Sequence, residues 1–308
     1  MPAPNLPIRL AAFQWLSEQV AIHGDVLPRR PLLEQGFTYQ NQRIPLVSAQ
    51  GIFKPAVMDL PLTITTTAEG PYDDSFAGDD VLMYRYRGTN PNHHDNVGLK
   101  RCMAEQLPLI YFHGHVKNLY QPIWPVYIVG AHDESLTFEV RADQMLVAMT
   151  ERSLGNAAES SLAYDTEQEH RRRYATALVR QRLHQASFRE RVLSAYREHC
   201  ALCRLKHREL LDAAHIVPDT DEWGSPEVRN GLSLCKIHHA AYDKNVLGVT
   251  PDYKVEIRED VLQEIDGPML LHGLQEMHGA KLWVPRRDDF RPDRDRLAWR
   301  YERFRKAV

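Results

Sequence analysis

Hydrophobic positions near the amino terminus recur at helical spacing. Residues 8–23 place Leu10, Phe13, Leu16 and Val20 three or four positions apart, which is the period of an amphipathic helix. The next segment, residues 27–67, is rich in Pro and Gly and carries only short β-prone runs. We therefore expect an opening helix followed by small strands and turns.

Strict alternation of apolar and polar positions begins after residue 80. From 81 to 87, Leu82, Tyr84 and Tyr86 share one face, and the intervening Met and Arg residues share the other. Three further β-prone runs, separated by Pro, Gly and Asp turns, cover residues 107–112, 124–130 and 136–140. This pattern predicts a mostly β region whose sheet is strongly curved or closed into part of a barrel.

A helix is predicted to lead into the carboxy-terminal part of the chain. Residues 147–163 are small and polar, which is typical of a linker. Residues 167–200 then combine helical propensity with helical periodicity, and Phe188, Val192 and Tyr196 fall on one face. We expect this helix to run directly to the residues from 200 onward.

The last part of the chain adds two more predicted elements. Residues 246–260 are typical of a strand pair, and the residues after Pro292 are typical of a basic helix. The whole pattern predicts an α+β protein, and 308 residues are enough for two domains. We place one domain at residues 1–150, a linker and helix at 151–180, and a second domain at 181–308.

Composition and charge narrow the class of protein. The hydrophobic fraction of 43% and the charged fraction of 26% are those of an ordinary globular protein. No apolar run approaches the roughly 18–20 residues of a membrane span, and the amino terminus lacks the features of a signal peptide. We therefore expect a cytoplasmic protein with no membrane partner. The net charge of −3 excludes an indiscriminate nucleic-acid binder, so DNA contact would need local cationic patches.

Three of the four cysteines lie in one short segment and have the spacing of metal ligands. Cys200 and Cys203 form one pair with a two-residue gap, and Cys235 and His238 form another. Two such pairs place four donors within tetrahedral reach, as a closed structural Zn²⁺ site requires. The alternative is an accidental cluster of buried thiols. Cys102 stands apart, and we interpret it as a small core hydrophobe.

The residues around these pairs resemble the HNH nuclease family, whose fold is called ββα-metal. In that family a His ends the first strand of a hairpin, an Asn lies beyond it, and a second His sits on the following helix. His215, Asn230 and His239 match those positions. Cys235 and His238 share a helix face, whereas His239 is rotated by about 100°. We therefore assign His238 to zinc and His239 to the nuclease site, with the opposite assignment as the alternative.

The resemblance implies hydrolysis of a phosphodiester with one divalent cation. His215 would be the general base, because a neutral imidazole with a pKa of about 6.5 accepts a proton from water at physiological pH. His239 would hold the catalytic Mg²⁺ or Mn²⁺, which polarises the phosphate. Asp243, four residues further on the helix, would orient that ring or touch the ion. Asn230 would hold the loop and His215 in place.

The chain departs from the family at one position. Many members have an Asp directly before the first His, where this chain has Ala214. Another carboxylate would have to complete the metal shell, and Asp212 and Asp243 are the candidates. The departure also supports an alternative function, that of a zinc-containing DNA-binding protein that no longer cuts.

The β-rich region resembles a second family, the SRA domain, a PUA-like barrel that flips a methylated cytosine out of duplex DNA into a pocket. The family pattern combines Gly, Tyr and an acidic pair with a strand that ends Tyr-x-Gly and a later Asn and Leu. The matching residues are Gly70, Tyr72, Asp73, Asp74, Gly78, Tyr86, Gly88, Asn96 and Leu99. The resemblance implies that Tyr72 and Tyr86 would stack on the extruded base. Asp74, or alternatively Asp73, would accept a hydrogen bond from its exocyclic amine.

Simpler interpretations stand beside these. Tyr86 is also explained as barrel core, and the acidic residues as solvated turns. His93 and His94 lie in a turn-like stretch, and we interpret them as solvated loop residues. We interpret His113 and His115, at a strand end, as structural.

Five arginines on the predicted helix are candidates for contacts with the DNA backbone, with a solvated face as the alternative. They are Arg171, Arg172, Arg173, Arg180 and Arg182.

The two resemblances together imply a modification-dependent restriction endonuclease. An SRA/PUA-like domain would recognise 5-methylcytosine or 5-hydroxymethylcytosine in double-stranded DNA, and a zinc-stapled ββα-metal HNH domain would cut it. One alternative is an HNH nuclease whose β domain binds unmodified DNA, RNA or a different modification. We expect a homodimer, because a single HNH centre cuts one strand at each visit.

Overall fold

The computed structural model describes residues 5–67, 81–142 and 166–307, and it places an α+β chain in two compact units. The amino-terminal unit is Met1–Leu183 and the carboxy-terminal unit is His184–Val308. Along residues 166–181 side-chain placement is described only for Val179. Among the described residues, no helix is both long and apolar enough to cross a membrane.

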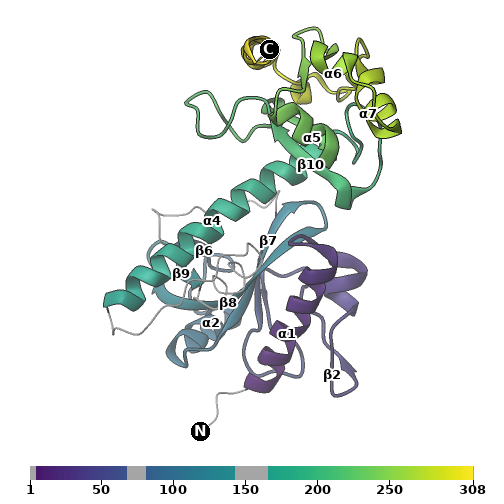
Figure 1. Ribbon diagram of the computed structural model, residues 1–308. Helices are drawn as coiled ribbons and strands as arrows, with labels where there is room; N and C mark the ends of the chain where they lie inside the picture. The colour runs from purple at the N-terminus through teal and green to yellow at the C-terminus, as the bar shows by residue number, and fades with distance from the viewer. Residues whose placement is uncertain (1–4, 68–80, 143–165, 308) are drawn as a thin grey trace. The chain divides into compact units, whose positions relative to one another are not determined.

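The amino-terminal unit is built around one curled sheet, a half-barrel (Figure 1). Its strands are β1 (Leu27–Pro28), β4 (Ile52–Phe53), β5 (Thr63–Thr66), β6 (Leu82–Arg85), β7 (Leu109–Val116), β8 (Leu119–His132) and β9 (Thr137–Ala142). The strand order is β4-β5-β7-β8-β9-β6, and β1 pairs with the start of β8. Only the pair of β5 with β7 is parallel among these described pairs. Register shifts along β8 mark bulges, which bend a strand and increase its twist.

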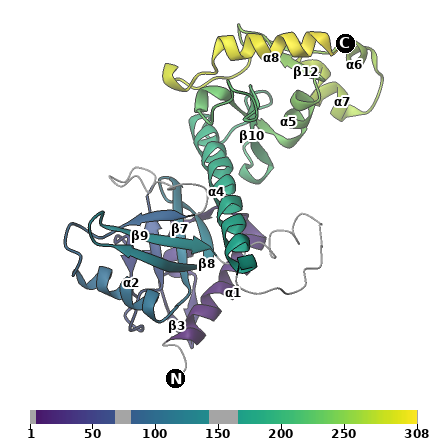
Figure 2. The same ribbon diagram turned by 90° about the vertical axis from the view of Figure 1, so that its left-hand side faces the viewer.

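Helices and short elements surround this sheet. They are α1 (Leu6–His23), the π-helical turn η1 (Arg29–Leu33), the hairpin β2 (Thr38–Tyr39) and β3 (Gln42–Arg43), α2 (His94–Ala104) and the start of α4 (Thr166–Ala195). Figure 2 shows β7, β8 and β9 side by side, with α2 close to them. The predicted opening helix and the β-rich region that follows are therefore confirmed.

Alternate residues of β7 supply two separate hydrophobic cores. Leu109 and Tyr111 pack in one core, together with residues of α2 and α4. Ile110 and Phe112 pack in the other core, together with residues of α1. A strand that is buried on both faces has a continuous apolar run, which is why residues 109–112 do not alternate between apolar and polar.

The buried face of α1 differs from the predicted one. Leu10 was expected in the apolar stripe, but 53% of its surface is exposed, whereas Arg9 is fully buried. The Arg9 guanidinium donates hydrogen bonds to the carbonyl oxygens of Pro108, at 2.8 Å, and Pro61, at 2.7 Å. Because those bonds give both terminal nitrogens of the buried cation a partner, the helix faces the core with Arg9, and Leu10 is turned outward.

The helix α2 was not predicted, because its first residues look like a turn. His93 caps it, and the His93 Nδ1 accepts a hydrogen bond from the Asp95 amide at 3.2 Å. The fully buried Asn96 binds the end of β6: its Oδ1 accepts from the Arg87 amide, and its Nδ2 donates to the Arg87 carbonyl. Hydrogen bonds therefore connect two parts of the SRA pattern, residues 86–88 and Asn96.

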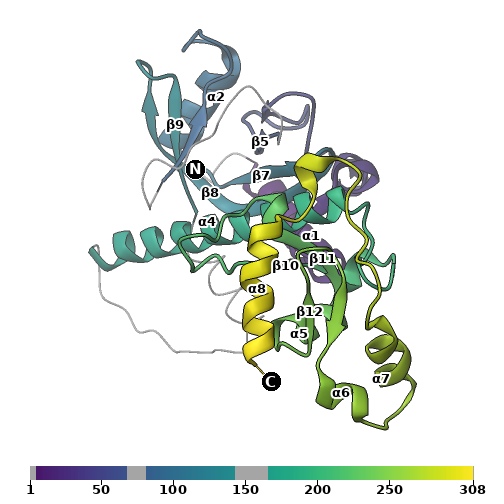
Figure 3. The same ribbon diagram turned by 90° about the horizontal axis from the view of Figure 1, so that it is seen from above.

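The carboxy-terminal unit combines a hairpin, a short helix and a second strand pair. Its elements are the end of α4, η2 (Arg208–Leu210), β10 (Leu211–His215), η3 (Val228–Asn230), β11 (Gly231–Cys235), α5 (Lys236–Asp243), β12 (Leu247–Val249), β13 (Val255–Ile257), α6 (Glu259–Gln263), α7 (Pro268–Gly273), η4 (Gln275–Met277), η5 (Asp288–Phe290) and α8 (Arg294–Lys306). Figure 3 shows α5 beside the hairpin, and α8 packs on β12. The predicted strand pair and terminal helix are confirmed.

The core of this unit holds the hairpin against α4. Phe188, Val192 and Tyr196 of α4 are buried there, as their spacing predicted. A Cβ at Gly231, the first residue of β11, would lie 2.4 Å from Val192 and 2.9 Å from Phe188. Only glycine permits that close approach of strand to helix. The strands pair antiparallel, with His215 opposite Gly231.

Candidate active site and metal centre

The four predicted zinc ligands converge on one point. Cys200, Cys203, Cys235 and His238 each offer a ligand atom, and all of these atoms lie within 4.8 Å of one another. The His238 Nδ1 is 3.4 Å from the Cys200 Sγ and 3.2 Å from the Cys235 Sγ. Three ligands are buried and Cys203 is exposed. Three soft sulfur donors and one imidazole in this space are the donor set of a structural zinc site.

The environment of His238 prepares its Nδ1 to bind a metal. Its Nε2 lies 2.7 Å from the Gly273 carbonyl oxygen, which can only accept a hydrogen bond. In the neutral form of the ring, which is the form that binds a metal, the proton is on Nε2 and the Nδ1 lone pair faces the thiols. Burial acts against a charged ring, but without a metal the contacts with Cys200 and Cys235 raise the pKa of His238 to about 10, so a metal ion that binds there displaces the Nδ1 proton. Contacts among the three sulfurs also lower the pKa of Cys235 and raise that of Cys203.

The hairpin and the next helix form the ββα arrangement that the sequence predicted. His215 ends β10, Asn230 directly precedes β11, and His239 lies on α5. His238 contacts the thiols, whereas His239 contacts carboxylates, as expected for neighbours about 100° apart on a helix.

His215 is held against an aromatic ring. Its imidazole stacks on Phe188, with centroids 3.9 Å apart and an interplanar angle of 12°. Burial is the largest cause that lowers the pKa of His215 below 6.5, and the charge of His239 adds to it. Asp219 and Asp243 oppose the shift. The ring therefore stays neutral, and able to accept a proton, at lower pH than an ordinary histidine does.

Asn230 fastens the segment that follows His215. Its Oδ1 accepts from the Val217 amide at 2.9 Å, and its Nδ2 donates to the carbonyls of Val217 and Ser225, each at 2.9 Å. Its backbone carbonyl accepts from Ile216 at 2.9 Å. These four bonds to a fully buried residue fix both ends of the loop between the two strands.

His239 lies between two carboxylates. Its Nδ1 is 3.4 Å from the Asp212 Oδ2, and its Nε2 is 3.3 Å from the Asp243 Oδ2. The hydrogen bond with Asp212 is the main cause that raises the pKa of His239. Oxygen and imidazole donors of this kind suit a divalent cation. Both carboxylates that were considered as replacements for the one missing at Ala214 therefore contact His239.

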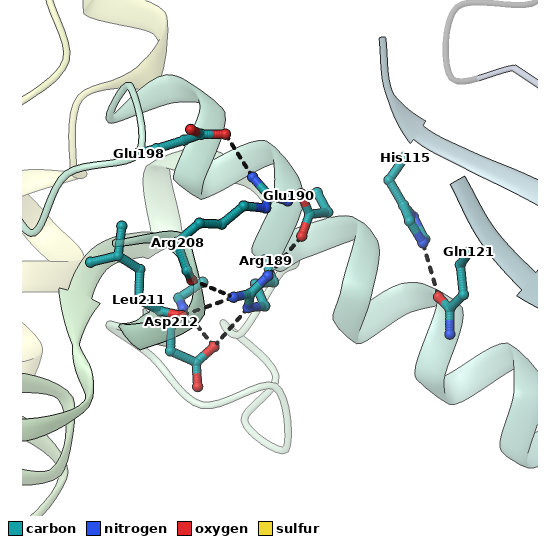
Figure 4. Close-up of polar contacts among 9 residues, drawn as sticks. His115, Gln121, Arg189, Glu190, Glu198, Arg208, Leu211 and Asp212 are labelled. Carbon is teal, nitrogen blue, oxygen red and sulfur yellow. Dashed lines mark hydrogen bonds and ion pairs between the residues drawn. The ribbon is translucent and has the colours of Figure 1, made fainter. Parts of the chain in front are cut away.

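A polar network beside the hairpin was not predicted. Glu190 of α4 is fully buried between Arg189 and Arg208, and Arg208 also contacts Glu198 at 2.7 Å (Figure 4). Arg189 reaches Asp212 at 3.5 Å. No motif marks these residues, because, apart from the adjacent Arg189 and Glu190, the partners are between 10 and 23 positions apart along the chain.

Of the four residues proposed for the base pocket, Tyr86 alone lies within the described residues. Tyr72, Asp73 and Asp74 lie outside the described residues. Tyr86 is 2% exposed, its ring stacks on Phe138 with centroids 4.1 Å apart, and its hydroxyl donates to the Asp133 Oδ1 at 2.8 Å. Tyr86 is thus part of the core, as the alternative interpretation had it.

The other predicted polar residues occupy the following places. The side chains of Arg171, Arg172, Arg173 and Arg180 are outside the described part of α4, and Arg182 is half-buried. His93 and His94, interpreted as loop residues, instead stand at the start of α2 beside Asp95. The Asp95 carboxylate pairs with Arg87, which already compensates its charge. His115 is buried against Gln121 at 2.9 Å, in keeping with a structural role (Figure 4).

Residues 200–250 match the sequence profile of the HNH endonuclease family (HNH_2). This range contains both ligand pairs, the hairpin, α5 and β12, so the site is that of an HNH endonuclease. The prediction of an endonuclease is confirmed by this match. No curated protein matches the chain.

Two solved structures are similar to the chain at low identity. One is described as a modification dependent TagI restriction endonuclease; it is 18% identical, the match covers 79% of this chain and 81% of that one, and the TM-score is 0.28. The other is KRYPTONITE in complex with mCHG DNA and SAH, at 14% identity and a TM-score of 0.20, over 37% of this chain and 26% of that one.

Proposed function

We propose that the chain is a modification-dependent DNA endonuclease. The carboxy-terminal unit cuts the phosphodiester backbone with its HNH site, and the amino-terminal unit recognises a modified cytosine, 5-methylcytosine or 5-hydroxymethylcytosine. The observation that carries the proposal is the ββα arrangement of His215, Asn230 and His239 beside the cluster of three Cys and one His.

Zn²⁺ is the proposed structural ion of the cluster. The tautomer of His238 that the Gly273 carbonyl selects supports this assignment, as do the three sulfur donors. Cys200 precedes the hairpin and His238 follows it, so an ion on these ligands ties together the two ends of the ββα motif. The cluster therefore stabilises the site without taking part in the reaction.

His215 is the proposed general base. It takes a proton from the attacking water as the new P–O bond forms and the bond to the leaving oxygen breaks. Its lowered pKa supports the role, because the ring is then unprotonated near neutral pH. Phe188 fixes the ring plane, and Asn230 fixes the backbone next to it.

His239 and Asp243 are the proposed ligands of the catalytic Mg²⁺ or Mn²⁺. When bound to these residues, a divalent cation would polarise the scissile phosphate and stabilise the charge on the leaving oxygen. Both side chains come from one turn of α5, where residues four apart share a face.

The reader function of the amino-terminal unit is proposed on the SRA pattern and the curled sheet. Asn96 bonds to the end of β6 next to Tyr86 and Gly88, which supports a shared structural motif. Tyr72 and Asp74, or Asp73, remain the proposed base-contacting residues. Given its burial, Tyr86 supports the pocket wall from within the core in this proposal.

Two further parts of the proposal concern DNA and assembly. Arg171, Arg172, Arg173, Arg180 and Arg182 contact DNA phosphates from α4. The active form is a homodimer on DNA, because each HNH centre cuts one strand and two centres are needed for a double-strand break.

The test is a digest of three matched duplexes that carry cytosine, 5-methylcytosine or 5-hydroxymethylcytosine, with Mg²⁺ and then with Mn²⁺. We expect cleavage only of modified duplexes. Equal cleavage of all three would retain the nuclease and remove the modified-base reader. Absence of cleavage from all three, with bound DNA, would favour a binding protein that no longer cuts.

A further inference from the structure

We propose that Asp212 and Arg189 are positioning residues of the nuclease site. Asp212 holds the Nδ1 proton of His239, so that Nε2 is the nitrogen that faces Asp243 and the divalent cation, and Arg189 holds Asp212 in that orientation. This inference rests on the proposed function, because it assigns His239 to the catalytic cation.

The two oxygens of Asp212 have different partners. Oδ1 accepts a hydrogen bond from the Ala213 amide at 2.8 Å and lies 3.5 Å from the Arg189 Nε. Oδ2 is left for His239, at 3.4 Å from its Nδ1. The carboxyl of Asp212 is half-exposed and faces a guanidinium, so it is an anion whose two oxygens can only accept hydrogen bonds.

This arrangement decides how the two ring nitrogens of His239 are used. An anionic carboxylate at Nδ1 favours the tautomer that carries its proton there. The Nε2 lone pair is then free for a cation, and the Asp243 Oδ2 at 3.3 Å supplies a neighbouring oxygen ligand. A carboxylate behind a metal-binding imidazole orients the ring and raises its basicity. Asp212 thus has a role different from that of the carboxylate that Ala214 lacks.

Arg189 is itself fixed from several sides (Figure 4). Its Nη2 donates to the carbonyl oxygen of Leu211, the first residue of β10, at 2.9 Å, and to that of Arg208 in η2, at 3.2 Å. Its Nη1 donates to the buried Glu190 at 2.7 Å. The guanidinium therefore joins α4 to the strand that carries both Asp212 and His215, and its rigid fork leaves Nε directed at Asp212.

The test uses the full chain with the substitution Asp212→Asn, which keeps the size of a half-exposed side chain. The Ala213 amide and Arg189 are both donors, so the Asn oxygen stays on their side and its NH₂ group faces His239. We expect the proton of the neutral His239 ring to move to Nε2. NMR spectra of ¹⁵N-labelled histidine detect this change at a pH above the pKa of the ring. We also expect Mn²⁺ affinity to fall 10- to 100-fold, in titrations without DNA.

Two further variants separate positioning from loss of fold. Asp212→Glu keeps the anion, so it should restore the Nδ1–H signal and part of the Mn²⁺ affinity. Arg189→Lys should weaken Mn²⁺ binding less than Asp212→Asn does, because Asp212 keeps its bond to the Ala213 amide. Asp252→Asn, an exposed carboxylate in the turn between β12 and β13, is the control and should bind Mn²⁺ like the wild type.

The outcomes distinguish this inference from the proposed function. Unchanged His239 tautomer and Mn²⁺ affinity in Asp212→Asn, with wild-type cleavage intact, would overturn the positioning role alone. A wild type that neither binds Mn²⁺ at His239 nor cleaves DNA would overturn the proposed function. Retained zinc in each variant confirms that the fold survives.

Discussion

At the scale of single residues, the site works by giving neighbouring histidines different surroundings. His238 faces three sulfurs and a backbone carbonyl, His239 faces two carboxylates, and His215 faces a phenyl ring. In the proposed function, histidine thereby serves as a ligand of a structural metal, as a ligand of a catalytic metal and as a proton acceptor. The environment of each ring, rather than its identity, decides its chemistry.

The pH dependence of cleavage tests the environment of His215. Burial lowers the pKa of this ring, and the base must be unprotonated to act, so activity should rise with pH through a value below 6.5 and then level off. A bound divalent cation would move that value further in the same direction. The measurement is kcat/KM against pH under saturating metal. An acidic limb centred above 6.5 would contradict the assignment.

A substitution of Asn230 tests how the loop after His215 is held in place. Asn230→Ala removes three side-chain hydrogen bonds and leaves the buried Val217 amide without its acceptor, so we expect a loss of about 2–3 kcal/mol in unfolding free energy. Urea denaturation measures it. Gln263→Ala removes a bond between exposed residues on α6 and should change stability by less than about 0.5 kcal/mol. Equal effects of the two substitutions would contradict the role of Asn230.

At the scale of elements, the cluster of three Cys and one His brings the residues before the hairpin together with the helix after it. Cys203→Ser should lower the zinc content of the purified protein and the thermal stability of the carboxy-terminal unit, because binding free energy is folding free energy in such sites. Cys102→Ala removes a buried thiol of the other unit and should leave the zinc content unchanged. A well-folded wild type without bound metal would rule out the zinc assignment.

Periodic elements and the zinc and HNH motifs were predictable from the sequence, because their signals are local. Spacing located α1, α4 and the four Cys and His residues, and the resemblance to the HNH family located the hairpin. The helix α2 was missed because its cap, His93, resembles a turn residue, and Leu10 was misplaced because Arg9 finds buried carbonyl partners far along the chain.

The contacts around Asp212 were predictable only in part. Its position near His215 suggested a replacement carboxylate, but its contact with His239 depends on how β10 packs on α5. Arg189 and Glu190 gave no signal, since their partners come from a turn and a strand beyond α4. The position of Tyr86 in the sequence was compatible with a base pocket and with the core of the barrel. Alternation along a strand shows which face a residue is on, but it does not distinguish these two places.

At the scale of the whole molecule, the proposal joins a reader unit to a cutting unit in one chain. If double-strand cleavage needs two HNH centres, light scattering should give a mass above that of one 35.6 kDa chain on a modified duplex. The same duplex without the modification is the control and should recruit fewer chains. A strict monomer that still makes double-strand breaks would contradict the homodimer.

The most direct test of the central claim is cleavage of a modified duplex by the wild type and by His215→Ala, under single-turnover conditions with Mn²⁺. The account predicts metal-dependent cleavage by the wild type and a rate lower by about 10²- to 10⁴-fold in His215→Ala, with zinc content unchanged. Equal rates for the two proteins would contradict the assignment of His215 as the base and with it the proposed nuclease site.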